Sequence, residues 1–106
     1  MKPLSDNTLA TITVILHLMG EINRLKLLLA CLEKPQSVSD LAQRLQLSVP
    51  LVSHHLRLLR SARLLCAKRD GKHIFYEIAD EHVRCILDDI ISHFIEEESV
   101  ECHETL

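Results

Sequence analysis

The segment LLCAKRDGKHIFYEI, residues 64–78, restricts the fold of this chain more than any other, because the segments around it have helical periodicity. Apolar and polar residues alternate on both sides of the pair Asp70-Gly71. An Asp-Gly pair between two alternating runs predicts a β-hairpin, because a tight type I′ turn requires positive φ angles. We therefore predict one small hairpin within an otherwise helical chain.

Five helices are predicted around this hairpin, four before it and one after it, from apolar spacing and from capping residues. Their predicted ranges are from a cap at Ser5 or Asp6 to Gly20, about 21–33, from a cap at Ser37 to Leu45, from a cap at Ser48 to about 62, and about 80–97. The tail, 98–106, is predicted to be frayed. The fold class is thus mainly α with a small β-hairpin, in the order α-α-α-α-β-β-α.

Length and composition fit a single domain over residues 1–106. The chain is long enough for one core and too short for two, and its 47% hydrophobic and 25% charged residues are typical of a globular protein. The longest apolar run, around residues 12–19, is too short to span a bilayer, and the N-terminus lacks the layout of a secretory signal. We therefore expect a cytoplasmic protein with no membrane partner.

Charge is distributed unevenly along the chain, although the net charge is only −3. Residues 41–75 hold seven bases against one acid, which gives +6, whereas residues 76–106 hold ten acids against Arg84 alone, which gives −9. The third and fourth helices, joined by a tight turn, form a helix-turn-helix at about 38–62, and the hairpin at about 64–78 follows it as a wing. A basic unit of this architecture predicts binding to DNA.

The fourth helix is predicted to enter the major groove, and the wing to lie along the phosphate backbone. The residues predicted to contact base edges or phosphates are Ser48, Ser53, His54 and His55 near the helix start, Arg57 and Arg60 further along it, and Lys68, Arg69, Lys72 and His73 at the wing tip. Two alternatives are that these charges form only a solvated surface, or that the winged helix docks another protein. We favour DNA because the positive charge gathers on this one unit.

Taken together, the motifs resemble a known family. The run SVSDLAQRLQLSVPLVSHHLRLLRSARLL, followed by AKRDGKHIFYEI, is similar to the ArsR/SmtB family of dimeric winged-helix repressors, and the likeness extends from GEINRLKLLLACL to the last helix. The resemblance implies a homodimer formed through the first and last helices. It also implies that this dimer binds a pseudo-palindromic operator in double-stranded DNA and is released by an inducer.

The last helix carries two histidines, His82 and His93, on nearly the same face. They are 11 residues apart, which is about 16 Å along a helix axis, so they cannot share one ion within a single chain. Asp80 lies beside His82, and Glu96 lies one turn beyond His93. If two copies of the helix pack antiparallel, Asp80 and His82 of one chain meet His93 and Glu96 of the other, which gives two equivalent sites per dimer.

Two imidazoles and two carboxylates suit Zn²⁺, with Co²⁺ or Ni²⁺ as substitutes. The set Asp-x-His…His-x-x-Glu is also similar to the C-terminal interface site of zinc-sensing family members. Another site of the family uses a cysteine where this chain has Ser37, which argues against that site and against the thiolate site of arsenic sensors. We therefore predict a repressor that zinc releases from its operator.

Other interpretations of these residues remain open. Asp80 could serve only as a helix cap, and each histidine only as a packing residue. Cys85, Cys102 and His103 are candidate additional ligands, and Cys85 and Cys102 could instead make the protein a sensor of redox or sulfur species. The sequence has no nucleophile-and-base pair, so neither an enzyme nor a small organic substrate is expected.

Overall fold

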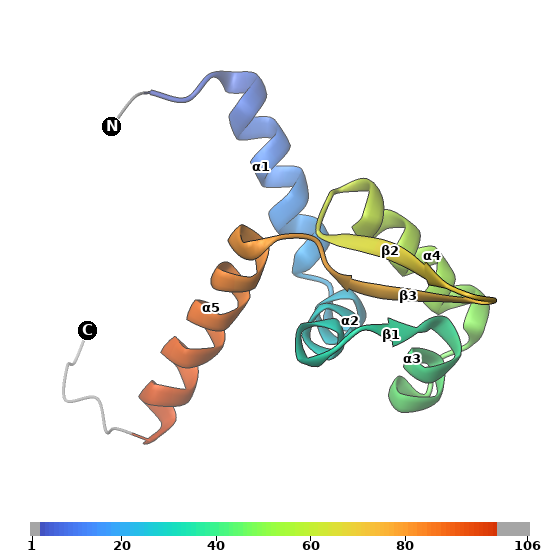
Figure 1. Ribbon diagram of the computed structural model, residues 1–106. Helices are drawn as coiled ribbons and strands as arrows, with labels where there is room; N and C mark the ends of the chain where they lie inside the picture. Colours follow the sequence, from blue (N-terminus) through green and yellow to red (C-terminus); the bar gives the residue numbers. More distant parts are fainter. Residues whose placement is uncertain (1–2, 100–106) are drawn as a thin grey trace.

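The structure, a computed structural model, describes residues 3–99, with side chains described as far as residue 95 (Figure 1). Its elements are α1 (Asp6–Met19), α2 (Ile22–Glu33), β1 (Gln36–Ser37), α3 (Val38–Leu45), α4 (Val49–Ser61), β2 (Leu65–Asp70), β3 (His73–Ile78) and α5 (Glu81–Ser99). The five predicted helices and the hairpin are confirmed. Ser5, Ser37 and Ser48 cap their helices as predicted, each accepting a hydrogen bond from the N–H three residues later.

The core lies where α2, α3 and α4 pack together and against the hairpin. Apolar residues at helical spacing on α2 and α4 are fully buried there, among them Leu27, Leu28, Val52, Leu56 and Leu59. The apolar spacing of α2 predicts that Ile22 is buried, but it lies in the first turn of the helix and is exposed. The helix-turn-helix is therefore fixed from behind by α2 and by the sheet.

The hairpin belongs to a three-stranded antiparallel sheet of order β1-β3-β2. Sequence reasoning missed β1, because two residues are too few to show alternation. The turn also differs from the predicted type I′. Asp70 pairs with His73, so the central residues are Gly71 and Lys72, and of these only Gly71 has a positive φ, +65°. Positive φ at the first central residue alone is the pattern of a type II′ turn, in which glycine occupies that position.

Two residues with left-handed backbone conformations lie before and after α4. Gln46 (φ 56°, ψ 46°) ends α3, and the next N–H, that of Leu47, is donated to the Ala42 carbonyl (3.0 Å), which makes the tight turn of the helix-turn-helix. Arg63 (φ 62°) follows the end of α4. Arg63 therefore lies beyond the helix and not on the outer face that carries Arg57 and Arg60.

Helices α1 and α5 extend away from the rest of the fold (Figure 1). No residue of α1 is buried. The start of α5 is anchored by the buried side chains of Val83 and Leu87, and Arg84 Nη1 donates a hydrogen bond to the Leu32 carbonyl at the end of α2 (3.1 Å). The remainder of α5 projects from the body. Within residues 3–99, no helix is both long and apolar enough to cross a membrane.

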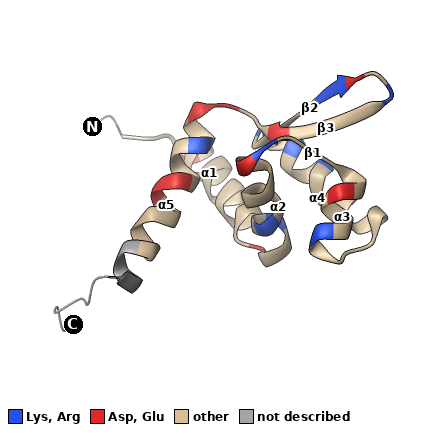
Figure 2. Ribbon diagram, turned by 60° about the horizontal axis from the view of Figure 1, so that its bottom comes forward, with Lys and Arg blue, Asp and Glu red and all other residues tan. Residues whose placement is uncertain are grey.

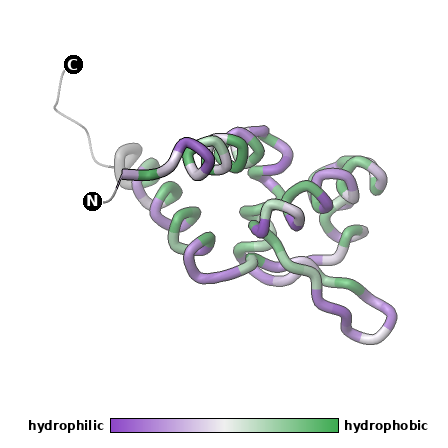
Figure 3. Tube along the Cα trace, turned by 90° about the horizontal axis from the view of Figure 1, so that it is seen from above, coloured by the Kyte–Doolittle hydropathy of each residue, from purple (hydrophilic) through white to green (hydrophobic). Residues whose placement is uncertain are grey.

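Apolar residues recur along both projecting helices (Figure 3), and several of their side chains remain exposed. They are Leu9, Ile12, Val14 and Leu16 on α1, and Ile86, Ile90, Phe94 and Ile95 on α5. Leu16, Ile86 and Ile90 line a groove between the two helices, and Leu25 and Leu29 of α2 line it as well. Contiguous exposed apolar surface of this kind is typical of a protein–protein interface.

Candidate functional site

The outer side of α4 and its N-cap present half of the predicted DNA-contacting residues. Ser48, His54, Arg57 and Arg60 are exposed, and Ser53 is partly exposed. The opposite side of the helix is buried in the core, so these side chains are held on a rigid element. Ser48 Oγ accepts the Leu51 N–H (3.2 Å), and its hydroxyl hydrogen can still be donated to another group.

His55 is a correction to the predicted DNA-contacting set. Its side chain is only 7% exposed, because it lies on the same face of α4 as Leu59, four residues later, and Val52, three residues earlier. Burial lowers the pKa of His55; the negative charge of Glu21 raises it, and the positive charges of Arg24 and His54 lower it further. The Nδ1 atom of His55 has no hydrogen-bond partner in the structure. The spacing from the two core residues was the signal that could have excluded His55 from the DNA surface.

The wing carries the second group of predicted contacts, Lys68, Arg69, Lys72 and His73, all of them exposed. Lysine and arginine gather on the wing and on the helix-turn-helix, whereas acidic side chains recur along α5 (Figure 2). Lys68 is different from the others, because its Nζ atom forms an ion pair with Glu77 Oε1 across the hairpin (2.6 Å), which raises the pKa of Lys68. Lys68 therefore offers less positive charge to a phosphate than Arg69 or Lys72.

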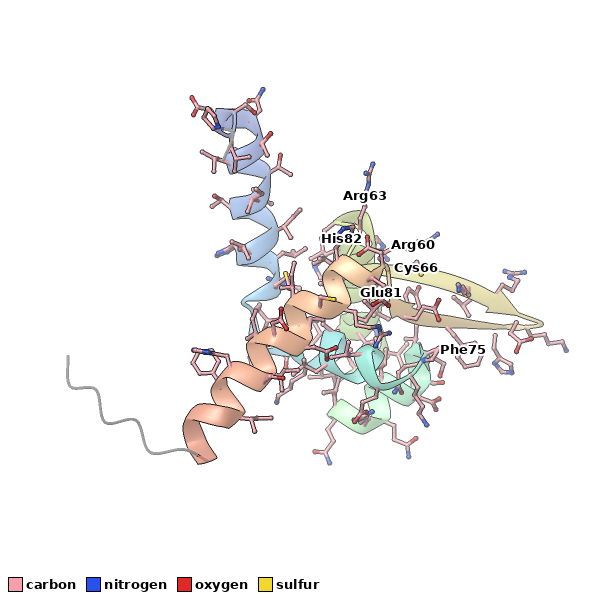
Figure 4. The ribbon with its side chains drawn as sticks, turned by 60° about the vertical axis from the view of Figure 1, so that its left-hand side comes forward. Arg60, Arg63, Cys66, Phe75, Glu81 and His82 are labelled. Atoms are coloured by element: carbon pink, nitrogen blue, oxygen red, sulfur yellow. The ribbon has the colours of Figure 1, made fainter. Side chains whose placement is uncertain are left out.

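The predicted ligands Asp80 and His82 lie together at the start of α5, where Figure 4 labels His82 and its neighbour Glu81. Asp80 Oδ1 accepts the Val83 N–H (3.0 Å), so Asp80 is an N-cap, as the alternative interpretation held. His82 Nδ1 lies 3.9 Å from the same oxygen, and its side chain is almost fully exposed. A carboxylate has a second oxygen, so the cap does not prevent Asp80 from binding a metal ion.

His93 lies on the projecting part of α5 and is exposed, with its ring edge-on to Phe94 at a centroid distance of 5.0 Å. Cys85, one turn after His82, is exposed as well. Within the described residues, no three His, Cys, Asp or Glu side chains come together as a metal-binding group. Of the other predicted ligands, the side chain of Glu96 and the whole of Cys102 and His103 lie outside the described residues.

Comparison with known proteins identifies the family. Residues 22–66 match the family model described as "Bacterial regulatory protein, arsR family". The chain is 34% identical to the HTH-type transcriptional regulator KmtR of Mycobacterium tuberculosis over 84% of its own length and 68% of that protein's. This chain belongs to the ArsR family. It is therefore related to DNA-binding transcription regulators and not to enzymes, in agreement with the sequence-based prediction.

Two further comparisons concern metals and assembly. The chain is 32% identical to the cadmium resistance transcriptional regulatory protein CadC homolog of Staphylococcus aureus, over 87% of this chain and 64% of that one. Its fold is similar, with a TM-score of 0.80 over the whole of both chains at 22% identity, to a homodimeric winged helix-turn-helix DNA-binding domain, Mb0332 of Mycobacterium bovis. The second likeness confirms that this ArsR-family chain has the winged helix-turn-helix fold.

Proposed function

We propose that this ArsR-family protein is a transcriptional repressor that binds operator DNA as a homodimer and is released when Zn²⁺, or a similar divalent ion, binds between the two subunits. The two copies of α4 and of the wing contact the DNA, and α1 and α5 form the dimer interface. The observation that carries the proposal is the pair of exposed apolar faces on α1 and α5, one of which also bears the predicted ligands.

The DNA-binding part of the proposal is supported by position and charge. Arg57, Arg60, Arg69 and Lys72 are exposed on the two elements that contact DNA in winged helices. A duplex bound through several such side chains releases counterions, so the affinity should fall steeply as salt concentration rises. A winged helix that only docked another protein would not give a steep salt dependence with duplex DNA.

The metal part of the proposal is supported by an incomplete ligand set within one chain. Asp80 and His82 supply one carboxylate and one imidazole within reach of a common ion. The other predicted pair, His93 and Glu96, lies too far along α5 to complete that site from the same chain. A second copy of α5 running antiparallel would complete it, and the apolar stripe on α5 would hold the two copies together.

The ion, when bound, would supply a rigid connection between the two subunits. Coupling between two ligands of one protein is typically about 1–3 kcal/mol, and DNA must weaken zinc binding by the same factor as zinc weakens DNA binding. A sensor based on cysteine would depend on Cys85 among the described thiols, because Cys66 is only partly exposed and Cys31 is buried, with its pKa raised to about 12 by burial. We rank that alternative below metal sensing.

The test measures the affinity of the full chain for duplex DNA with and without Zn²⁺. A duplex selected from a randomised library by the metal-free protein is labelled and titrated with wild type, His93→Ala and, as a matched control, His73→Ala on the wing. We expect Zn²⁺ to weaken binding about 5- to 150-fold in wild type and in the control, and to have no effect in His93→Ala. Equal affinity of wild type with and without Zn²⁺ would refute the metal part of the proposal.

A further inference from the structure

The first turn of α4 exposes two large apolar side chains at the end of the helix that approaches DNA. Val49 is 49% exposed and Leu51 is 38% exposed, and Pro50 between them is exposed as well. The next apolar residues along the helix, Val52 and Leu56, are instead fully buried. The exposed pair is therefore not an extension of the core, and its surface must face solvent or a partner.

The exposed surface of α4 changes character along the axis, beginning with Val49 and Leu51, which flank the first turn on different sides because they are two residues apart. The apolar first turn is followed one turn later by Ser53 and His54, and then by Arg57 and Arg60. Arg57 lies eight residues beyond Val49, which is about 12 Å along the axis, and this is comparable with the width of the major groove of about 12 Å. A helix that enters the groove by its first turn can thus place arginines at the phosphates of the groove edge.

Hydrogen-bonding groups in the first turn are largely occupied or missing. The Leu51 N–H is donated to Ser48 Oγ (3.2 Å), and the Val52 N–H is donated to the Ser48 carbonyl (3.0 Å). Pro50 has no N–H to donate. Apart from the Ser48 hydroxyl hydrogen, the surface that this turn offers to a base pair therefore consists mainly of methyl and methylene groups.

We infer that Val49 and Leu51 recognise the C5-methyl groups of thymine in the major groove. Thymine is the only base of DNA that presents a methyl group there, and apolar side chains are the groups that contact it. The arginines Arg57 and Arg60, further along the exposed surface of α4, fit a polyanion and oppose a purely apolar protein partner. This inference rests on the proposed function, and it predicts thymine at the operator positions that face the first turn of α4.

The test removes the methyl groups without changing base pairing or phosphates. A duplex selected from a randomised library by the metal-free full chain is synthesised again with 2′-deoxyuridine in place of thymine, one position at a time and then throughout. Removing the methyl group of one contacted thymine should lower the affinity of wild type about fourfold, which corresponds to about 0.8 kcal/mol for one buried methyl group. The salt dependence should be the same for both duplexes, because the phosphate contacts are unchanged.

Variants assign the effect to the two residues. Val49→Ser with Leu51→Ser should bind the thymine and deoxyuridine duplexes equally, whereas Ile74→Ser, which alters an exposed apolar residue of the wing, should keep the wild-type difference. Thermal unfolding of each variant checks the fold, which should be little affected because these side chains are largely exposed. Salt-dependent binding with no preference for thymine in wild type would refute the inference alone. A preference that persists in the double variant would also refute it, and the absence of salt-dependent duplex binding would refute the proposed function itself.

Discussion

Replacing Ile90 by alanine should weaken the homodimer far more than the same change at Ile74. Ile90 is 50% exposed in the groove between α1 and α5, and Ile74 is 42% exposed on the wing. The substitution removes three carbon atoms, worth about 0.8 kcal/mol each when fully buried, so covering the exposed half at an interface stabilises by about 1.2 kcal/mol per copy. In a dimer with twofold symmetry the change occurs twice, for a total of about 2.4 kcal/mol.

That free energy corresponds to a rise of about 60-fold in the dimer dissociation constant. Sedimentation equilibrium over a range of protein concentrations measures the constant for wild type, Ile90→Ala and Ile74→Ala. The wing variant should dimerise like wild type, because its side chain lies away from α1 and α5. Dissociation constants of both variants equal to that of wild type would contradict an interface through the α1–α5 groove, and an increase of the same size in both would point to an effect on folding.

Three further predictions concern buried or strained residues. Burial lowers the pKa of His55, so the folded state keeps the imidazole neutral at pH values at which the unfolded chain protonates it, below about pH 6.5. Stability should therefore decrease as the pH falls through this range. Thermal unfolding measured from pH 8 to pH 5 should show a smaller loss of stability for His55→Leu than for wild type. Gly71→Ala should lower the free energy of unfolding by about 1 kcal/mol, because Gly71 has φ +65° and no atom near a new Cβ would offset the strain; an unchanged denaturant midpoint would contradict this. Cys31 should resist alkylation in the native protein at pH 8 and react only in denaturant, since its thiol is buried with a pKa of about 12; peptide mass spectrometry reads the outcome, and equal rates in both states would disprove it.

Most of the fold could be predicted from the sequence because its signals are local. Ser37 and Ser48 cap helices through their own side chains, and the apolar spacing of Val52, Leu56 and Leu59 fixes the buried side of α4 within one helix. What could not be predicted depends on contacts between distant segments. The strand β1 exists only because Gln36 and Ser37 pair with Tyr76 and Phe75, some forty residues later.

In the candidate site, too, the features set by local sequence could be predicted, and those set by contacts between distant segments could not. Exposure on α4 follows from helical periodicity, which correctly places Arg57 and Arg60 outside and would have placed His55 inside. The ion pair between Lys68 and Glu77 depends on the register of the hairpin. This register differs from the predicted one because the turn is centred on Gly71 and Lys72 and not on Asp70 and Gly71. The pairing of Asp80 and His82 with the ligands of a second subunit stays a prediction, because one chain cannot contain it.

The sign of the proposed regulation restricts its mechanism. Zinc adds positive charge, and by Coulomb attraction alone this would strengthen binding to DNA. At physiological salt, charges are screened over about 8 Å, so ions on α5 act weakly on exposed arginines elsewhere. Release by zinc therefore requires a change of geometry. α5 is fixed to α2 through Arg84 and the Leu32 carbonyl, and α2 packs against α4. Turning the two α5 helices against each other would thus carry α2 and α4 with them, and would change the distance between the two recognition helices that an operator must match.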